Sequence, residues 1–169
     1  MELQLALDRI EKKRAIDIVE SLKDLIDIVE IGTPFSIMQP IEIINDFKKI
    51  SPCLRVLADY KIMDGGYALA EIAYKAGADI VTVSAQTWDE TILQTIQAAR
   101  DYGKQVLVDM MGIKEEDIAE RGFAAHWKYK HATISQDEDE FDKWLKQIRA
   151  ALNSPTENAV DFLDNFKLS

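Results

Sequence analysis

Short apolar runs recur along the first part of the chain, and their pattern is typical of buried strands. Five of them are rich in Val, Ile and Leu: residues 3–8, 26–32, 54–60, 79–85 and 105–111. Several are nearly continuous rather than alternating between apolar and polar, as in parallel strands that are covered on both faces. The pattern therefore predicts five parallel strands.

Segments with helical periodicity lie between these strands: residues 11–25, 40–50, 66–79 and 87–104. In the third of them, the predicted apolar stripe consists of Leu69, Ile72, Ala73 and Ala76, and Gly77 is expected to end the helix. In the fourth, Thr87 is the expected N-cap and Gly103 follows the last turn. Alternating strands and helices predict an α/β fold, with a barrel and an open sheet both possible.

Acidic side chains stand where four of the predicted strands end. These residues are Asp8, Glu30, Asp59 and Asp109. In βα-barrels and in open parallel sheets alike, ligands bind at the carboxyl ends of the strands, so this edge is the candidate site. The alternative remains open that Glu30 caps a loop and that Asp8 and Asp109 cap the helices that follow them.

The segment ADYKIMDGG, residues 58–66, gathers three charged side chains at the end of the third strand. Lys61 stands between Asp59 and Asp64, and Gly65 and Gly66 follow. The arrangement suits a site that handles a carbanion or an enediolate, since the carboxylates keep the lysine charged; a surface salt-bridge turn is the alternative. The glycines suit a positive φ or close helix packing and do not form a dinucleotide-binding GxGxxG loop.

Composition narrows the possible partners. The chain has 169 residues and a net charge of -10, which argues against binding to nucleic acid and against docking on anionic membranes. Its one cysteine, Cys53, excludes an intrachain disulfide and a thiolate zinc cluster. No signal peptide and no apolar run of membrane-spanning length is evident in the sequence, so we expect a cytoplasmic protein.

Five motifs at the predicted strands resemble one enzyme family, in order and in spacing. They are LALD, VEIGTPF, ADYKIMDGG, AGADIVTV and GKQVLVDMMGI. Together they are similar to 3-hexulose-6-phosphate synthase and 3-keto-L-gulonate-6-phosphate decarboxylase, of the orotidine 5'-monophosphate decarboxylase superfamily, and VDMMG looks more like the synthase. The resemblance covers residues 1–114. It implies part of a (βα)8 barrel, here an incomplete TIM-type barrel of about five parallel strands, and a homodimer.

The resemblance also implies a role for each charged residue of the edge. Glu30 and Asp59 would hold Mg2+, Lys61 would lie against the enediolate oxygens, and Asp64 would reach into the site of the partner subunit. The two other carboxylates would line the pocket: Asp8 and Asp109. The substrate would be a sugar phosphate of the ribulose 5-phosphate class, and the synthase reaction adds its enediolate to formaldehyde. Hard oxygen ligands suit Mg2+, which stabilises enolate charge as a Lewis acid.

After Lys114 the pattern changes, and the sixth to eighth strands of the family, with its histidine site and its phosphate-binding loops, are not recognisable. Residues 116–169 contain DIAERGFAAHWKYK and two helical patterns, at 138–152 and 156–166. They resemble the end of the synthetase domain of RelA/SpoT-type alarmone synthetases, without the nucleotide-binding and catalytic motifs of those enzymes. We therefore expect a chimera of a partial barrel at 1–114 and a helical tail at 115–169, joined near Ile113–Glu116.

Four functions remain possible from the sequence. The first is an aldehyde-lyase of the 3-hexulose-6-phosphate synthase type, and the second is the related decarboxylase. The absence of recognisable phosphate-binding strands could make the first of these inactive, and the third function is a non-catalytic fragment or chimeric scaffold. The fourth, alarmone synthesis, requires motifs that the sequence does not contain.

Overall fold

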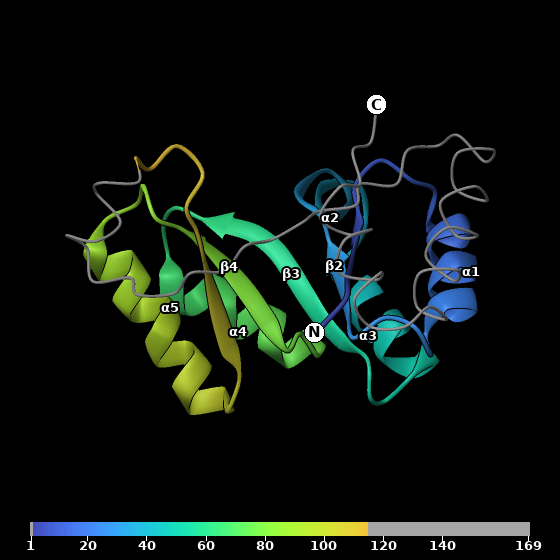
Figure 1. Ribbon diagram of the computed structural model, residues 1–169. Coiled ribbons are helices and arrows are strands. Elements are labelled where there is room, and N and C mark those ends of the chain that lie inside the picture. The colour runs from blue at the N-terminus through green and yellow to red at the C-terminus, as the bar shows by residue number, and fades with distance from the viewer. Residues whose placement is uncertain (1, 115–169) are drawn as a thin grey trace, which may run out of the picture.

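The computed structural model describes residues 2–114, and within them helices alternate with strands (Figure 1). The strands are β1 (Gln4–Leu7), β2 (Ile28–Ile31), β3 (Arg55–Ile62), β4 (Ile80–Ser84) and β5 (Gln105–Asp109). The helices are α1 (Lys12–Leu22), α2 (Thr33–Met38), α3 (Ile43–Ile50), α4 (Gly66–Ala76) and α5 (Asp89–Tyr102). The five predicted strands are confirmed. The predicted helices of the tail lie outside the described residues.

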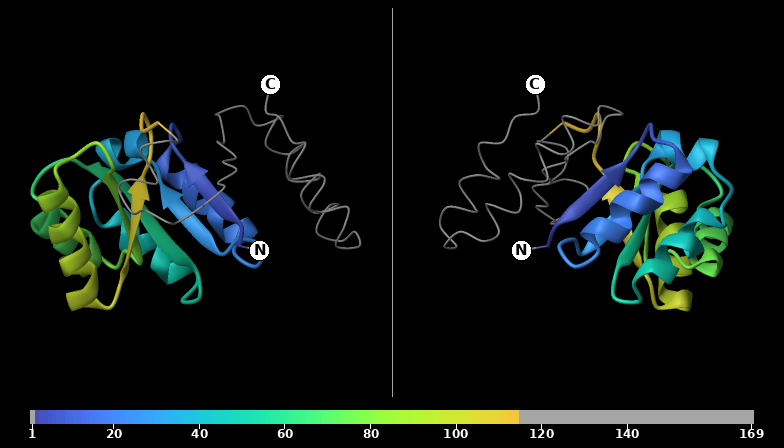
Figure 2. Two further views of the ribbon diagram at one scale, coloured as in Figure 1. Left: turned by 60° about the vertical axis from the view of Figure 1, so that its left-hand side comes forward. Right: turned by 90° about the vertical axis from the view of Figure 1, so that its right-hand side faces the viewer.

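The five strands form one parallel sheet in the order β1-β2-β3-β4-β5. Each strand therefore pairs with the next strand along the chain, as in the wall of a βα-barrel. Right-handed crossovers between neighbouring parallel strands place all the connecting helices on the same side of such a wall. The strands curve with the helices along their outer side (Figure 2). This arrangement confirms the predicted α/β fold: residues 2–114 form five parallel strands of a TIM-type barrel.

Alternate residues of each strand face two different apolar layers. One set packs with the helices into the main core, which includes Leu5, Val29, Val56 and Val81. The other set forms a small cluster of Ile28, Leu57 and Ile80, with Leu107 packed against it. Because side chains alternate along a strand, the cluster lies on the opposite face of the sheet, which corresponds to the interior of a barrel. Beyond this apolar layer, towards the carboxyl ends, the same face carries polar side chains.

Helix α4 packs on α5 through small residues, which differs from the predicted stripe. Its buried residues are Gly66, Ala70, Ala73 and Tyr74. Leu69 is 44% exposed and Ile72 is 50% exposed, so the predicted stripe is wrong for these two residues, whereas Ala73 of the same stripe is fully buried. A Cβ on Gly66 would lie 2.2 Å from the Thr91 carbonyl oxygen of α5, which shows how closely the two helices approach. Small residues allow this close approach at the start of α4, while at its other end Tyr74 packs against Tyr102 of α5 with ring centroids 6.0 Å apart.

Two helix starts also differ from the sequence prediction. The short helix α2 was not expected; it begins directly after Gly32 and has Pro34 in its first turn, where proline fits because its missing N–H needs no partner. Helix α5 has Trp88 rather than Thr87 as its N-cap. The Thr87 hydroxyl donates instead to the Met63 carbonyl oxygen, so it fastens the loop after β3 to the loop after β4. The predicted helix ends at Gly77 and Gly103 are confirmed, since both glycines have a positive φ at a C-cap.

At the amino-terminal edge of the sheet, Asp79 binds two lysines from different parts of the chain. Its Oδ2 lies 2.8 Å from Lys48 Nζ and its Oδ1 lies 2.8 Å from Lys104 Nζ. The Val56 N–H donates to the same carboxylate at 3.0 Å. Burial alone would raise the pKa of Asp79, but the hydrogen bonds from Lys104, Lys48 and Val56 outweigh it and lower that pKa. The contact joins α3, β3 and β4 on the side of the sheet away from the candidate site.

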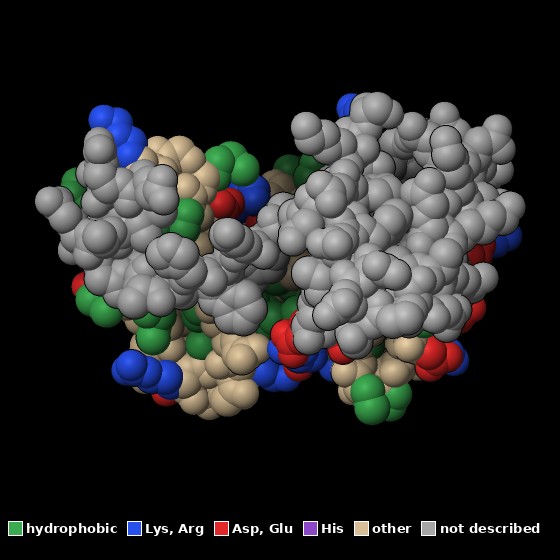
Figure 3. All heavy atoms as spheres, viewed as in Figure 1, with side chains coloured by type: hydrophobic (Ala, Val, Ile, Leu, Met, Phe, Trp, Pro, Cys, Tyr) green, Lys and Arg blue, Asp and Glu red, His purple; other side chains and the backbone are tan. Residues whose placement is uncertain are grey.

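The described surface is mixed in charge and carries a group of exposed apolar side chains. Acidic and basic side chains are interspersed on the described part of the face seen in Figure 3. The exposed apolar group on α4, α5 and the loops before them consists of Met63, Leu69, Ile72, Trp88 and Leu93; we call it the α4–α5 patch. None of the helices in the described part of the chain has the length and hydropathy needed to cross a membrane.

Candidate active site

The carboxyl end of β3 is irregular, and this irregularity places Lys61. Ala58 pairs with Val81 and Ile62 with Val83, so β3 advances four residues while β4 advances two. Within this bulge Lys61 has a φ of 44°, in the left-handed region. Its backbone N–H donates to Thr82 Oγ1 at 2.8 Å. A non-glycine residue in that region costs on the order of 1 kcal/mol or more, and such strain is typical of functional sites.

Asp59 is buried at the centre of the site, and hydroxyl groups hold both of its carboxylate oxygens. Thr82 Oγ1 donates to Oδ1 at 2.8 Å, and Thr33 Oγ1 lies 2.8 Å from Oδ2. Thr33 comes from the start of α2 and Thr82 from β4, so three neighbouring parts of the fold orient this carboxylate. Only 6% of Asp59 is exposed, and these bonds keep its oxygens facing the carboxyl edge.

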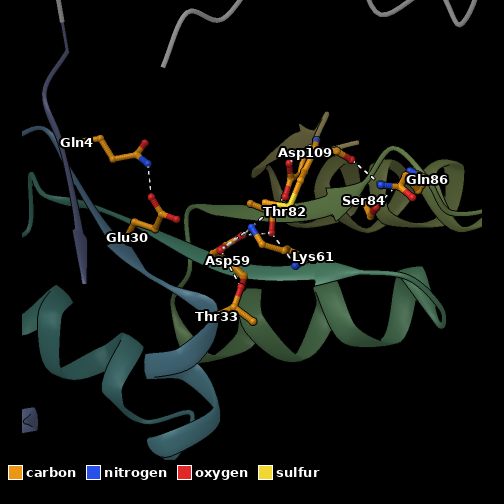
Figure 4. A network of polar contacts seen from close by, with 10 residues as sticks. Gln4, Glu30, Thr33, Asp59, Lys61, Thr82, Ser84, Gln86 and Asp109 are labelled. Atoms are coloured by element: carbon orange, nitrogen blue, oxygen red, sulfur yellow. Dashed lines mark hydrogen bonds and ion pairs between the residues drawn. The ribbon is translucent and has the colours of Figure 1, made fainter. Parts of the chain in front are cut away.

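Lys61 bridges two carboxylates of the site (Figure 4). Its Nζ lies 2.9 Å from Asp59 Oδ2 and 2.9 Å from Asp109 Oδ2. Burial alone would lower the pKa of Lys61, but the hydrogen bonds to Asp59 and Asp109 outweigh it and raise that pKa. The two carboxylates therefore favour the protonated, positively charged form of Lys61.

Glu30 is a buried carboxyl group beside the Lys61 bridge. Gln4 Nε2 donates to Glu30 Oε2 from the neighbouring strand β1. Burial, and after it the negative charges of Asp59 and Asp8, raise the pKa of Glu30 to about 7, although the Gln4 hydrogen bond and the positive charge of Lys61 act in the opposite direction. The site thus concentrates negative charge next to Glu30, and a cation would relieve the repulsion.

Asp8 and Asp109 lie at the ends of β1 and β5. Asp8 is half-buried, and its carboxylate reaches over the start of α2, since a Cβ on Gly32 would lie 2.1 Å from Asp8 Oδ1. Asp109 is held through both oxygens, because the Met111 N–H donates to Oδ1 at 2.9 Å while Oδ2 binds Lys61. The structure therefore brings Asp8, Glu30, Asp59, Lys61 and Asp109 to one edge of the sheet.

Asp64 is not part of this group. It is exposed in the loop after β3, and within residues 2–114 no hydrogen bond or ion pair joins it to another side chain. Its neighbour Met63 belongs to the α4–α5 patch and is 53% exposed. Asp64 faces outward beside an apolar surface, so its expected role in the site of a partner subunit remains a proposal.

Three polar residues of the site were missed from the sequence: Gln4, Thr33 and Thr82. A signal for two of them is the period of two along a strand, which places Gln4 with Ala6, and Thr82 with Ile80, on the face opposite the helices. A polar side chain at a buried strand position is unusual and points to a local partner. Thr33 carried no such signal, because the helix it begins was not expected.

The described residues fit a magnesium ion. Glu30 and Asp59 supply hard oxygen ligands, and a bound cation would offset the repulsion between the two carboxylates. Gln4 Oε1 adds a buried oxygen that has no hydrogen-bond partner. No cluster of three or more metal-ligating side chains occurs among residues 2–114. Mg2+ does not require one, since it commonly binds one or two carboxylates and completes its octahedron with waters and substrate oxygens.

A parallel βα-barrel wall that gathers charged side chains at its carboxyl edge has the arrangement of barrel enzymes, whose active sites lie at that face. The chain belongs to the Orotidine 5'-phosphate decarboxylase / HUMPS family, whose model matches residues 1–144.

Relatives within this family carry one name repeatedly. The chain is 46% identical over 116 residues to the 3-hexulose-6-phosphate synthase of Bacillus subtilis (strain 168), which covers 68% of this chain and 55% of the relative. The crystal structure of 3-hexulose-6-phosphate synthase from Salmonella typhimurium is 34% identical and has a TM-score of 0.69, covering 100% of this chain and 76% of that one. The 3-keto-L-gulonate-6-phosphate decarboxylase structure from Vibrio cholerae is 26% identical, with a TM-score of 0.65, over 69% of this chain and 55% of that one.

The chain spans about half the length of the curated relatives it matches. The family match extends past Lys114, to residue 144. The resemblance of residues 116–169 to alarmone synthetases, and with it the chimera, stays a prediction that lies outside the described residues.

Proposed function

We propose that the chain is an aldehyde-lyase of the 3-hexulose-6-phosphate synthase type, which adds the enediolate of ribulose 5-phosphate to formaldehyde with the help of Mg2+. The observation that carries the proposal is the bridge of Lys61 between Asp59 and Asp109, at hydrogen-bond distance from both. The names of the most similar relatives support the same reaction.

In this proposal each residue of the edge has a separate task. Lys61 places a positive charge where the enediolate oxygens develop negative charge, and electrostatic stabilisation of this kind is commonly the largest catalytic contribution. Because Lys61 is already protonated, the proton of the sugar must go to a carboxylate or to a group from elsewhere. Asp59 orients Lys61, and Asp109 holds it from the opposite side. Asp8, at the end of β1, lines the pocket.

Glu30 and Asp59 would hold Mg2+, which as a Lewis acid stabilises charge on the oxygens of the enediolate. Asp59 is pre-oriented for this by Thr33 and Thr82. Both carboxylates are buried, so water competes little for their oxygens.

We further propose that two chains associate through the α4–α5 patch. The exposed apolar side chains of this patch lie on the neighbouring helices α4 and α5 and in the loops before them, and exposed apolar patches commonly mark an interface. Asp64 borders the patch, being next to Met63, and this position suits its expected reach into the site of the partner subunit.

The test is a calorimetric titration with Mg2+, and then with ribulose 5-phosphate in the presence of Mg2+, on the wild type and on Asp59→Ala. We expect saturable binding that the substitution abolishes, together with Mg2+-dependent formation of a hexulose phosphate from ribulose 5-phosphate and formaldehyde. Asp46→Ala, at an exposed ion pair of α3, is the matched control and should bind as the wild type does. Binding without turnover would reduce the proposal to a ligand site, and no binding in any form would mean a non-catalytic scaffold.

A second candidate, the related carboxy-lyase, is favoured by the structural similarity to 3-keto-L-gulonate-6-phosphate decarboxylase. Both reactions pass through an enediolate, so Glu30, Asp59 and Lys61 would have the same tasks. Assays of both reactions on one sample separate them: release of carbon dioxide from 3-keto-L-gulonate 6-phosphate, without aldol addition to formaldehyde, would favour the decarboxylase.

A further inference from the structure

Gln4 contacts the site through one end of its carboxamide and leaves the other end without a partner. Its Nε2 donates to Glu30 Oε2, and the two side chains point towards each other from neighbouring strands (Figure 4). Its Oε1 is buried, and it is the one buried side-chain oxygen or nitrogen lacking a hydrogen bond in the part of the chain that the structure describes. The register of β1 and β2 explains why the two side chains meet. Gln4 pairs with Ile28 and Ala6 pairs with Glu30, so Gln4 and Glu30 lie diagonally across from each other on the same face of the sheet.

A buried oxygen without a hydrogen-bond donor destabilises the fold, because it loses its hydrogen bonds to water on folding and forms none within the protein. A side chain whose task was only to hold the fold would be better replaced there by an apolar one of the same length. The oxygen therefore points to a donor that arrives with a ligand. At a site with two carboxylates for Mg2+, the donor at hand is a water molecule on the cation, since Mg2+ keeps several of its waters when it binds.

We propose that Gln4 is a positioning residue for the cation: Nε2 orients Glu30, and Oε1 accepts a hydrogen bond from a water bound to Mg2+. The proposal rests on the proposed magnesium site and assigns its second layer of contacts. By donating to Oε2, Gln4 fixes the rotation of the Glu30 carboxylate. Partners that hold metal ligands in this way commonly affect metal affinity by about 10- to 100-fold.

The experiment is a calorimetric titration of the full chain with Mg2+ alone, combined with thermal unfolding without metal. Gln4→Met removes both polar ends and keeps the length of the side chain. We expect Mg2+ affinity to fall about tenfold or more, while the unfolding temperature without metal changes little, because removal of the unpaired oxygen offsets the lost hydrogen bond to Glu30. The matched control is Gln94→Met, which removes another amide-to-carboxylate hydrogen bond, to Glu90, on the surface of α5; its Mg2+ affinity should not change.

The outcomes separate this proposal from the proposed function. If the wild type binds Mg2+ and Gln4→Met binds it equally well, the role of Gln4 is refuted and the magnesium site stands. If the wild type does not bind Mg2+, both fail. Gln4→Asn, which keeps the amide but shortens it by one methylene, serves as the second variant and should also bind weakly. If neither variant folds without metal, Gln4 serves the fold and the proposal is overturned.

Discussion

Lys61 Nζ of β3 lies 2.9 Å from Asp109 Oδ2 of β5, although the two residues are 48 positions apart in the chain. Strand β4 runs between them, and its Thr82 accepts from the Lys61 N–H and donates to Asp59. Three adjacent strands therefore determine the position of one ammonium group. This arrangement costs strain at Lys61, which indicates that the position of Nζ matters for function.

Replacing Lys61 by methionine tests that conclusion. We expect Lys61→Met to lower the rate of enediolate chemistry by about 100-fold or more, because it removes the fixed positive charge that faces the developing oxyanion. Mg2+ affinity should not weaken, since Asp59 loses a competing cation. Steady-state kinetics and Mg2+ calorimetry on the same samples measure both effects.

The matched control is Lys49→Met, because Lys49 also pairs with an aspartate but is 67% exposed on α3. Exposed pairs of this kind contribute little, so its rate should equal that of the wild type. A Lys61→Met protein with full activity would remove Lys61 from the mechanism.

The buried carboxyl of Glu30 predicts a pH dependence of stability in the metal-free protein. Its pKa is raised from 4.5 to about 7 in the folded state, so the folded protein holds this proton more tightly than the unfolded chain. The associated stability is fully present below about pH 4.5 and is lost as the pH rises towards 7. The shift corresponds to an effect on the order of 3 kcal/mol.

Chemical denaturation of the wild type and of Glu30→Gln across this pH range measures the effect, because the difference between the two curves isolates Glu30. Glu30→Gln should lack this contribution. Since Mg2+ requires the ionised carboxylate, its affinity for the wild type should also weaken as the pH falls below 7. A pH-independent difference between the two proteins would contradict the prediction.

The α4–α5 patch predicts a concentration-dependent dimer. We expect light scattering to report two chains, and Trp88→Glu to shift the equilibrium towards single chains, because Trp88 is 83% exposed in the single chain and a charge in an apolar interface is costly. Trp88→Phe keeps an apolar ring and should retain the dimer. A wild type that stays monomeric at every concentration would refute the interface.

The sequence was sufficient for the sheet and for most of the residues at its edge. Continuous apolar runs predicted the parallel strands, and parallel strands necessarily bring their carboxyl ends to one edge. This is why Glu30, Asp59 and Asp109 could be grouped before their contacts were known. The glycine positions were also informative, since Gly65 has a φ of 59° and Gly66 lies against α5.

Other features depend on tertiary contacts that no local pattern records. The sequence places Lys61 between Asp59 and Asp64, yet in the structure Asp109 takes the second position, because the bulge in β3 turns the lysine towards β5. The burial of α4 was misjudged for a related reason. Hydrophobicity favoured Leu69 and Ile72, but the close approach of α5 selects small residues instead.

Asp79 predicts a stability effect that is separate from the site. Asp79→Asn should lower the free energy of unfolding by about 1–3 kcal/mol, since it removes the ion pairs with Lys48 and Lys104. Asp46→Asn, whose partners are more exposed, should cost less than about 1 kcal/mol.

The pKa of Asp79 is lowered in the folded state, so the advantage of the wild type over Asp79→Asn is present above the unfolded-state pKa of 3.8 and should disappear as the pH falls through the folded-state pKa. Denaturation at neutral and acid pH measures this difference, and equal stability of the wild type and Asp79→Asn at neutral pH would contradict it.

Replacing Gly66 by alanine should destabilise the protein, although alanine is the better helix former. Exchanging glycine for alanine inside a helix normally stabilises it by up to about 1 kcal/mol. At Gly66 the added Cβ would lie 2.2 Å from the Thr91 carbonyl oxygen and 2.8 Å from Thr95 Oγ1. We therefore expect Gly66→Ala to lower the free energy of unfolding by about 1–3 kcal/mol, because α4 must move away from α5.

Gly103→Ala is the control: its Cβ would meet nothing within 4 Å, and its φ of +62° costs about 1 kcal/mol by itself. Denaturation of both variants measures the difference. Since α4 begins directly after Asp64 and Gly65, movement of the helix should also weaken dimerisation in Gly66→Ala but not in Gly103→Ala. A Gly66→Ala protein as stable as the wild type would mean that the contact between α4 and α5 adapts without cost.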